Sequence, residues 1–337
     1  MNNFTIKKLA ESKDKSIFTL SKVISEEQQR FLQHKVDFTG WEYLDKEKEQ
    51  DLLSNLQTHP LFRFINLAIC TNMALDIQNS GKVIAGTTDT RTTPRDPKIV
   101  LEKESKEVNV QQINIDSNIT YNDLDSFIST SQKEKKLEAV ATDDIISNLI
   151  MLGFNGTHRS KNSDPQLYPL GQDVIKGWLQ KIRDDAPQSV LNNETVGKAQ
   201  SNKNLNDLFK KAKKQLPPVI AKSGKLIAIC GSNILPDVEI QFTYNELSFK
   251  KEQATLSQKT IAGIKCIVMP YFPENSVLIT TLDNLRLAFQ NNTTRFALLN
   301  NPSKSRIEHW FSTNVDYIID SYKSAILIEN IEIIEDE

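Results

Sequence analysis

The segment from residue 79 to residue 116 limits most strongly what this chain can fold into. Within it, residues 86–97 are rich in β-branched threonine and include Pro94 and Pro97, and short apolar stretches follow at residues 99–101 and 108–115. We expect those stretches to be strands separated by a charged turn. A two-stranded excursion is at best marginally stable alone in water. The sequence therefore predicts a long hairpin that has no obvious place inside a compact subunit and needs a neighbour to lie on.

Length and composition narrow the class of protein. The chain has 337 residues, which favours two domains or one domain with long excursions. Its 39% hydrophobic and 25% charged residues are typical of an ordinary globular protein. The net charge of -2 disfavours a protein whose main task is to grip nucleic-acid phosphates, because counterion release supplies most of that affinity. Neither a membrane helix nor an export signal is expected, since no long apolar run occurs.

Residues that could carry chemistry are few and widely spaced. Cys70, Cys230 and Cys266 each lie in an apolar run and are expected to be buried free thiols in a reducing cytosol. No histidine lies three or four residues from another, and none lies near a cysteine in the sequence. The short ligand spacing that is typical of a zinc site is therefore missing. We therefore expect no catalytic residue, no metal and no cofactor.

Three weaker patterns have ordinary structural explanations. The run 230–233 could suggest a phosphate site, but it lacks the further glycines of a dinucleotide fold and the Gly-Lys-Ser/Thr of a P-loop. A strand-to-helix turn capped by Ser232 or Asn233 is the better interpretation. Adjacent carboxylates at 143–144 and 184–185 point about 100° apart on a helix and cannot share one proton. The lysines within 210–214 are expected to form a solvated helix face, with nucleic-acid contact as the alternative.

The pattern of elements indicates an α+β protein and not a regular βαβ alternation. A long helix is expected over Tyr121–Leu152, begun by the capping pattern of Thr120 and Asp123 and ended by Gly153 and Gly156. The other elements expected are helices at 172–183 and 205–215, a loop at 192–203, strands at 225–230, 264–269, 277–280 and 285–289, and an alternating segment at 307–334.

Short blocks spread in order along the chain carry a family resemblance. They are Thr87–Thr90; Gln112–Asn114 with Asp116; Gly153–Gly156; Gln172–Val174, Gly177–Lys181, Arg183 and Ala186–Pro187; Pro270–Pro273, Leu278–Thr280, Leu282 and Asn284–Leu285; and Asn301–Pro302, Arg306, Glu308, Asn314 and Asp316–Tyr317. From about Asp51 onward the chain resembles the major capsid proteins of peduovirus-type tailed phages, which have the Hong Kong 97-type capsid fold. The first fifty residues and residues 190–263 match weakly, so the fate of the N-terminal segment and the construction of the hexamer centre stay open.

The resemblance implies an α+β capsid fold with an N-terminal arm, an extended E-loop hairpin, a peripheral domain with a long spine helix, and an axial domain. The implied divisions are an N-terminal arm or assembly segment at 1–50, the N-terminal part of the peripheral domain at 51–78, the E-loop at 79–116, the peripheral domain with the spine helix at 117–155, the axial domain at 156–281, peripheral strands at 282–322, and a C-terminal strand with an acidic tail at 323–337.

The implied function is self-assembly as pentamers and hexamers into an icosahedral shell that encloses double-stranded DNA of a tailed phage or phage satellite. The implied partners are other copies of the chain, a scaffolding protein, a portal and a maturation protease, with weak non-specific contact to the packaged DNA and no membrane. The protein would be assembled in the bacterial host cytoplasm and reside in the virion. An encapsulin-like compartment and a nucleotide-dependent α/β enzyme are the alternatives.

Two groups of residues follow from the resemblance. Candidate intersubunit contacts on the hairpin are Thr88, Asp89, Arg91, Arg95 and Asp96, with solvated loop charges as the alternative. Trp178 is expected either in the core or as an interface anchor, with the core favoured. The family-matching positions with structural roles are Gly153, Asn155, Gly156, Trp178, Lys181, Arg183, Pro270, Tyr271, Pro273, Arg306, Glu308, Asp316 and Tyr317.

Overall fold

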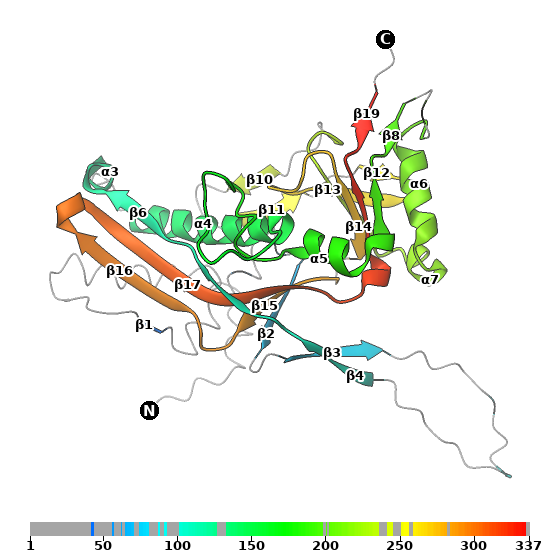
Figure 1. Ribbon diagram of the computed structural model, residues 1–337, viewed down its shortest axis with the longest axis horizontal. Helices are drawn as coiled ribbons and strands as arrows, with labels where there is room; N and C mark the ends of the chain where they lie inside the picture. The colour runs from blue at the N-terminus through cyan, green and yellow to red at the C-terminus, as the bar shows by residue number, and fades with distance from the viewer. Residues whose placement is uncertain are drawn as a thin grey trace.

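Two larger sheets and a long helix organise the molecule (Figure 1). The computed structural model describes residues 42–43, 56, 62, 65–70, 74–80, 87, 91–92, 101–126, 133–197, 200, 202–235, 241–244, 251–255, 259–281 and 284–334.

The first sheet is built around one long strand, β17. It has the order β1 (Glu42–Tyr43), β16 (Arg295–Asn301), β17 (Arg306–Ile319), β15 (Leu285–Gln290) and β2 (Asn66–Cys70), while β5 (Gln111–Asn114) and β6 (Ser117–Thr120) also pair with β17. Strand β17 is buried on both faces over most of its 14 residues. An alternating pattern was expected there, but buried residues occur at consecutive positions of the strand, polar as well as apolar.

The second sheet is mixed and lies beside a basic helix. Its order is β12 (Thr260–Ile261), β13 (Ile264–Val268), β9 (Leu226–Cys230), β14 (Val277–Thr281), β18 (Ile326–Glu329) and β7 (Val190–Asn192). All five residues of β9 are buried. Helix α6 (Leu205–Gln215) packs its buried residues Leu208, Phe209 and Ala212 into the same hydrophobic cluster.

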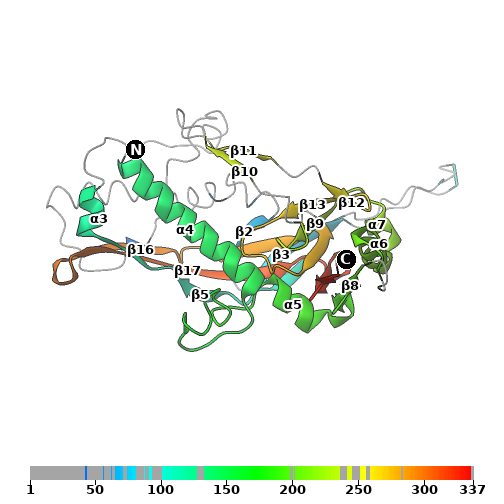
Figure 2. The same cartoon turned by 90° about the horizontal axis from the view of Figure 1, so that it is seen from above.

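Helix α4 (Lys133–Asn155) crosses the first sheet, as Figure 2 shows from above. Its buried residues Ile145, Ile146 and Leu149 share a hydrophobic cluster with β17 residues such as Phe311 and Val315. No helix among the described residues combines the length and the apolar character that crossing a bilayer requires. The other helices are α3 (Tyr121–Ser126), α5 (Trp178–Asp185) and α7 (Pro218–Ala221), with 3-10 turns at Pro187–Ser189, Pro302–Lys304 and Tyr322–Ser324.

Three further strand pairs stand outside the two larger sheets. They are β3 (Ala74–Ser80) with β4 (Leu101–Glu107), β10 (Gln241–Tyr244) with β11 (Lys251–Thr255), and β8 (Thr195–Val196) with β19 (Glu332–Ile333). We call the β3–β4 pair the arm. Figure 1 shows the arm projecting away from both larger sheets.

The expected long helix over 121–152 is wrong in its extent. The chain forms two helices, α3 and α4, which point in different directions in Figure 2. The capping prediction is confirmed, because the Thr120 Oγ1 atom accepts a hydrogen bond from the Asp123 backbone nitrogen at 3.2 Å. Gly153 does not stop the helix but lies inside it, and the helix continues to Asn155.

The hairpin prediction at 79–116 is shifted along the chain. The segment expected to be a charged turn is strand β4, which pairs with β3 from Ala74 to Ser80. Residues beyond 107 are not part of the excursion. Val108 and Ile113 are buried, and β5 pairs with β17. The two-stranded part of the arm therefore begins earlier and ends earlier than its apolar pattern indicated.

Other elements agree with the sequence to different degrees. Helix α6 has the predicted bounds, and strands β9, β13, β14 and β15 lie within one residue of prediction. The helix expected at 172–183 begins only at Trp178, since the Gln172 carbonyl is held by the backbone nitrogens of residues 157 and 158. The loop expected at 192–203 contains β8. The run after Cys230 forms a turn without the expected helix among the described residues.

Candidate functional site at the junction of the two sheets

Trp178 is the centre of a buried junction between helices and sheets. It opens α5 and is 0% exposed, so its place in its own subunit's core is settled and it cannot anchor a neighbour. Its ring packs edge-on against Tyr317 of β17 at 4.8 Å between centroids and lies 5.3 Å from the ring of Phe154 at the end of α4. The indole Nε1 donates to the Arg286 carbonyl of β15 at 2.9 Å. One side chain thus joins α4, α5 and two strands, and we call this cluster the junction.

Two family-matching glycines make the junction possible by close approach. A Cβ atom on Gly153 would lie 2.2 Å from the Trp178 ring, well inside van der Waals contact. A Cβ atom on Gly156 would lie 2.0 Å from the Ile175 carbonyl oxygen. Close packing, and not a left-handed helix end, therefore explains glycine at both positions.

Tyr317 adds a buried polar contact to the same cluster. Its hydroxyl donates to the Leu149 carbonyl of α4 at 2.8 Å, and the residue is 0% exposed. Burial, with a smaller contribution from the neighbouring Asp316 carboxylate, raises the pKa of the Tyr317 phenol above its ordinary value. The hydroxyl therefore stays protonated and keeps donating to the helix.

Asp316 connects the junction to the base of the arm. The Lys181 Nζ atom of α5 lies 2.6 Å from its Oδ1 atom, and the Asp316 side chain is only 5% exposed. Its Oδ2 atom accepts a hydrogen bond from the Asn109 backbone nitrogen at 3.0 Å. Because Asn109 follows β4 by two residues, the carboxylate fixes the point where the arm returns to the first sheet.

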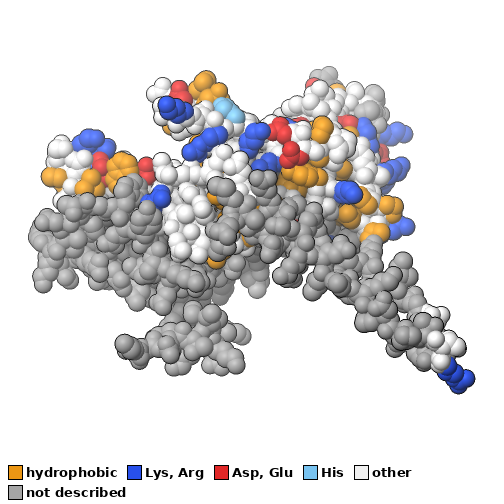
Figure 3. Space-filling model, turned by 60° about the horizontal axis from the view of Figure 1, so that its bottom comes forward, with side chains coloured by type: hydrophobic (Ala, Val, Ile, Leu, Met, Phe, Trp, Pro, Cys, Tyr) orange, Lys and Arg blue, Asp and Glu red, His pale blue; other side chains and the backbone are white. Residues whose placement is uncertain are grey.

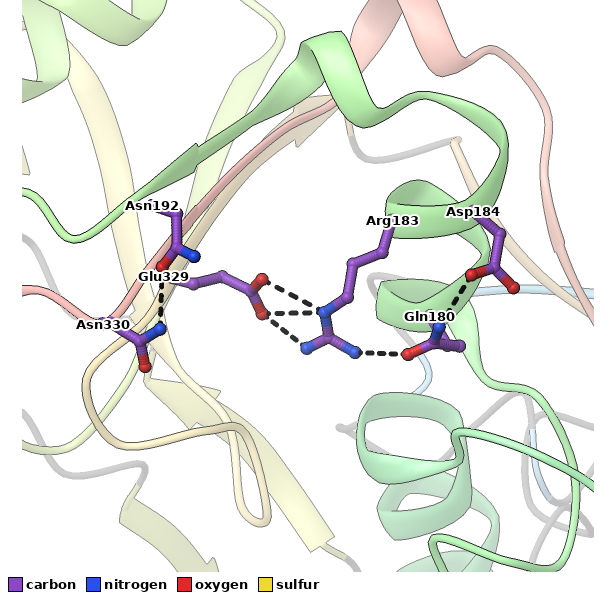
Figure 4. Close-up of polar contacts among 6 residues, drawn as sticks. All are labelled: Gln180, Arg183, Asp184, Asn192, Glu329 and Asn330. Carbon is purple, nitrogen blue, oxygen red and sulfur yellow. Dashed lines mark hydrogen bonds and ion pairs between the residues drawn. The ribbon is translucent and has the colours of Figure 1, made fainter.

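Arg183 connects α5 to the second sheet (Figure 4). Its Nε atom lies 3.1 Å from both carboxylate oxygens of Glu329 on β18, and its Nη1 atom donates to Gln180 at 2.9 Å. The next residue, Asn330, donates to the Asn192 side chain at 2.7 Å. A planar guanidinium held at several points fixes an orientation as well as a distance.

The turn at Pro270–Pro273 joins the second sheet to the end of α4. Tyr271 has a positive φ of 61°, and its carbonyl accepts a hydrogen bond from the Asn155 Nδ2 atom at 2.7 Å. Phe272 is buried and packs edge-on against Phe154 with 5.1 Å between centroids. The two prolines therefore shape a turn that docks an aromatic side chain.

Arg306 and Glu308 lie elsewhere, at the other end of β17. The Arg306 Nη2 atom is 2.6 Å from the Glu308 Oε1 atom, which also accepts from the Asn301 side chain at 3.1 Å. The hydrogen bond from Arg306 holds the pKa of the Glu308 carboxyl below its ordinary value. This pair supports the strand's turn after β16 and is separate from the junction.

The candidate intersubunit contacts lie in the sequence between β3 and β4. Arg91 and Thr92 form an exposed turn. Thr88, Asp89, Arg95 and Asp96 lie outside the described residues. Their role stays a prediction.

The weaker chemical candidates have structural surroundings. Cys70, Cys230 and Cys266 are buried free thiols, as predicted. Ser232 is exposed in a turn, and a Cβ atom on Gly231 would meet the Glu274 carbonyl at 2.0 Å. The glycine there serves a close turn-to-turn approach. Among the described residues no three His, Cys, Asp or Glu side chains gather in a group that could hold a metal ion.

The basic helix α6 is only in part a solvated face. The Lys211 Nζ atom lies 2.6 Å from Glu194, a residue that is 8% exposed, and Lys210 lies 3.6 Å from Asp207. Burial raises the pKa of the Glu194 carboxyl, but hydrogen bonds from Lys211 and Asn202 outweigh burial and leave it lowered. Figure 3 shows both signs of charge interspersed over the described part of one face.

Sequence reasoning missed several partners in these contacts. Arg286 pairs with Asp320 through its Nε and Nη2 atoms at 3.0 and 2.6 Å, and the Tyr322 hydroxyl contacts Asp185 at 2.5 Å. An arginine between two buried leucines of a strand is itself a signal, because a charge in an apolar run needs a partner. Glu329 gives the same signal at the end of β18.

Comparisons with known proteins agree with this architecture. The model of the phage major capsid protein family, P2 family, matches residues 25–331. The capsid proteins of Escherichia phage P2 are 32% identical over 267 residues, covering 74% of this chain and 75% of the relative. The major capsid protein of Serratia phage KSP20 is 26% identical over 272 residues, covering 75% of this chain and 78% of the relative.

A solved structure shows the same arrangement of helices and sheets. The satellite phage P4 procapsid that includes the size determination (Sid) protein matches with a TM-score of 0.71 and 29% identity, covering 84% of this chain and 99% of that chain. The fold is thus a mixed helix-and-sheet capsid fold, and the family is one of structural shell proteins and not of enzymes. This chain belongs to the P2 family of phage major capsid proteins.

Proposed function

We propose that the chain assembles as pentamers and hexamers into an icosahedral shell that encloses the double-stranded DNA of a tailed phage or phage satellite. The family match over residues 25–331 carries the shell function and favours a phage capsid over an encapsulin-like compartment. Many modest contacts made by identical copies become collectively strong when the assembly closes.

The arm supports contact between neighbouring copies. It is a ladder of two strands, β3 and β4, that belongs to neither larger sheet. Such a ladder gains little stability alone, so an E-loop that lies over the next subunit accounts for its extension. Single charge pairs at its exposed turn contribute little, and the contacts proposed for that region are Thr88, Asp89, Arg91, Arg95 and Asp96.

The remaining parts take the roles that the resemblance implies. We assign the first sheet with α4 as the spine helix to the peripheral domain, and the second sheet with α6 to the axial domain. The mixed surface charge and the net charge of -2 suit weak, non-specific contact with packaged DNA. A scaffolding protein, a portal and a maturation protease are the partners proposed for assembly in the host cytoplasm.

Electron microscopy of the purified chain, with and without its neighbouring phage genes, tests the proposal. A matched variant replaces residues 82–100 by a short Gly-Ser linker and leaves the β3–β4 ladder in place. We expect shells from the natural chain, and single chains or capsomers with an unchanged circular dichroism spectrum from the variant. A natural chain that stays monodisperse and fully folded at high concentration, with the neighbouring genes as well as without them, would contradict the shell function.

A further inference from the structure

The segment between α4 and α5, residues 157–173, is a long loop that projects beyond β5 in Figure 2. We call it the 157–173 loop. It contains no helix or strand, and most of its residues are exposed. Its conformation is nevertheless held at both ends and across its middle. The loop is thus ordered as well as exposed.

Two aspartates fix the middle of the loop. The Asp164 Oδ1 atom accepts hydrogen bonds from the backbone nitrogens of Gln166 at 2.9 Å and Leu167 at 3.2 Å. The Asp164 backbone nitrogen in turn donates to the Oδ2 atom of Asp173 at 2.8 Å, and Asp173 is 2% exposed. The buried Asp173 carboxylate therefore holds Asp164, and Asp164 holds the turn that carries Leu167.

The base of the loop is tied to the first sheet. The Arg159 Nη1 atom donates to the Gln112 carbonyl of β5 at 2.7 Å and to the Val174 carbonyl at 2.9 Å. The His158 and Tyr168 rings pack edge-on with 5.4 Å between centroids. Fixing a residue's backbone costs conformational entropy. These contacts meet that cost within the single chain, before any partner binds.

The tip of the loop is apolar and exposed. Leu167 is 67% exposed, the largest exposure among the large hydrophobic side chains that the structure describes, and Pro165 and Pro169 on either side are exposed as well. Asp164, the nearest carboxylate along the sequence, directs its Oδ1 atom to backbone nitrogens. The tip therefore offers an apolar surface that suits an apolar partner surface.

We propose that the tip of the 157–173 loop, residues 165–169, docks against a second copy of this chain in the assembled shell. The inference rests on the proposed shell function, which supplies identical copies at close range. Each copy also displays exposed apolar side chains that could receive the tip, among them Val219 at 61% and Tyr271 at 43%. A tip that is already ordered loses little entropy on docking, and a head-to-tail contact of this kind closes into a ring when the rotation between copies permits it.

The test compares three forms of the full chain in shell assembly. Leu167→Asp places a charge on the docking tip, and Leu167→Met keeps an apolar side chain of similar size. We expect Leu167→Asp to lower the yield of shells about tenfold, because a central apolar contact is lost, while Leu167→Met assembles normally. Because Leu167 is exposed, the melting temperature of the unassembled chain should be the same in all three.

A photocrosslinking amino acid at position 167 identifies the partner. In shells that still form, we expect crosslinked peptides that join position 167 of one copy to another copy. Normal shell yield from Leu167→Asp, crosslinks confined within one chain, or crosslinks to a different protein would each overturn the inference. A natural chain that forms no shells at all would instead refute the proposed function.

Discussion

The junction and the arm differ in where their stabilising contacts come from. In the junction, Trp178 packs against two aromatic rings, and its indole nitrogen donates a hydrogen bond to the Arg286 carbonyl. Its ring lies so close to Gly153 that no side chain would fit there. The arm is a two-stranded ladder outside both larger sheets. Asp316 joins the two regions through Lys181 and Asn109. Residues of the junction hold one subunit together, whereas we propose that residues of the arm contact its neighbours.

The largest effect is expected from Trp178→Ala. Removing a large aromatic side chain from a fully buried site costs about 3–5 kcal/mol, and here it also leaves the Arg286 carbonyl without its donor. Urea unfolding of the single chain should show a lower midpoint. Leu167→Ala is the control, with an expected change below about 0.5 kcal/mol because the side chain is exposed. Equal midpoints for the two variants would contradict the junction's role.

His309, on β17 of the first sheet, predicts a pH dependence of the free energy of unfolding. It lies at a cavity of about 90 Å³ that Asp116 and Asp144 also line, and burial lowers its pKa to about 4. The unfolded chain, with an ordinary histidine pKa near 6.5, binds a proton first as the pH falls. Stability should therefore decline between about pH 6.5 and pH 4, by up to roughly 3 kcal/mol.

The matched variant His309→Gln isolates this contribution. Its free energy of unfolding should fall less steeply than that of the natural chain across the same pH range. Both proteins are measured in urea at several pH values, so that the contributions of the carboxylates, which the two proteins share, cancel in the difference. Parallel curves would show that His309 is not buried in its neutral form.

Gly153→Ala tests the close approach of α4 to the tryptophan. The added methyl group would meet the Trp178 ring at 2.2 Å, and overpacking of this kind costs about 1–3 kcal/mol. In the double variant Gly153→Ala with Trp178→Leu, part of that cost should disappear. Additive losses in this double-mutant cycle would show that the two residues do not share one contact.

Asp316→Asn should have the smallest effect on the single chain and the most informative one. The change keeps the shape but removes the charge opposite Lys181, and we expect a loss of about 1–2 kcal/mol. Because Asp316 also accepts from Asn109, amides near the base of the arm should exchange faster with solvent. A destabilised junction with unchanged exchange around residue 109 would show that the arm is anchored independently.

Local signals explain what the sequence could predict. Helix α6 has its predicted bounds because an Asn204 cap accepts from the Asp207 nitrogen, three apolar residues form one stripe, and two prolines follow. The buried strands β9, β14 and β15 were predicted from their apolar runs. These elements carry their own start, stop and face in neighbouring residues.

Contacts between distant residues explain what the sequence could not predict. Strand β4 reads as a charged turn because its residues form no apolar pattern, and only pairing with β3 makes it a strand. Gly153 reads as a helix stop because its actual role depends on Trp178, on the next helix. The tryptophan ring occupies the space that a side chain at position 153 would need. The chain's family was visible in short ordered blocks, although most of those positions hold the subunit together.

Hydrogen exchange of the arm, measured in the unassembled chain and in the shell, tests the central claim most directly. Peptides covering β3 and β4 should exchange quickly in single chains, because a two-stranded ladder is marginal alone. They should become strongly protected in shells, while peptides covering Trp178 stay protected in both states. Arm peptides that are equally protected in the single chain would contradict an arm stabilised by an adjacent copy.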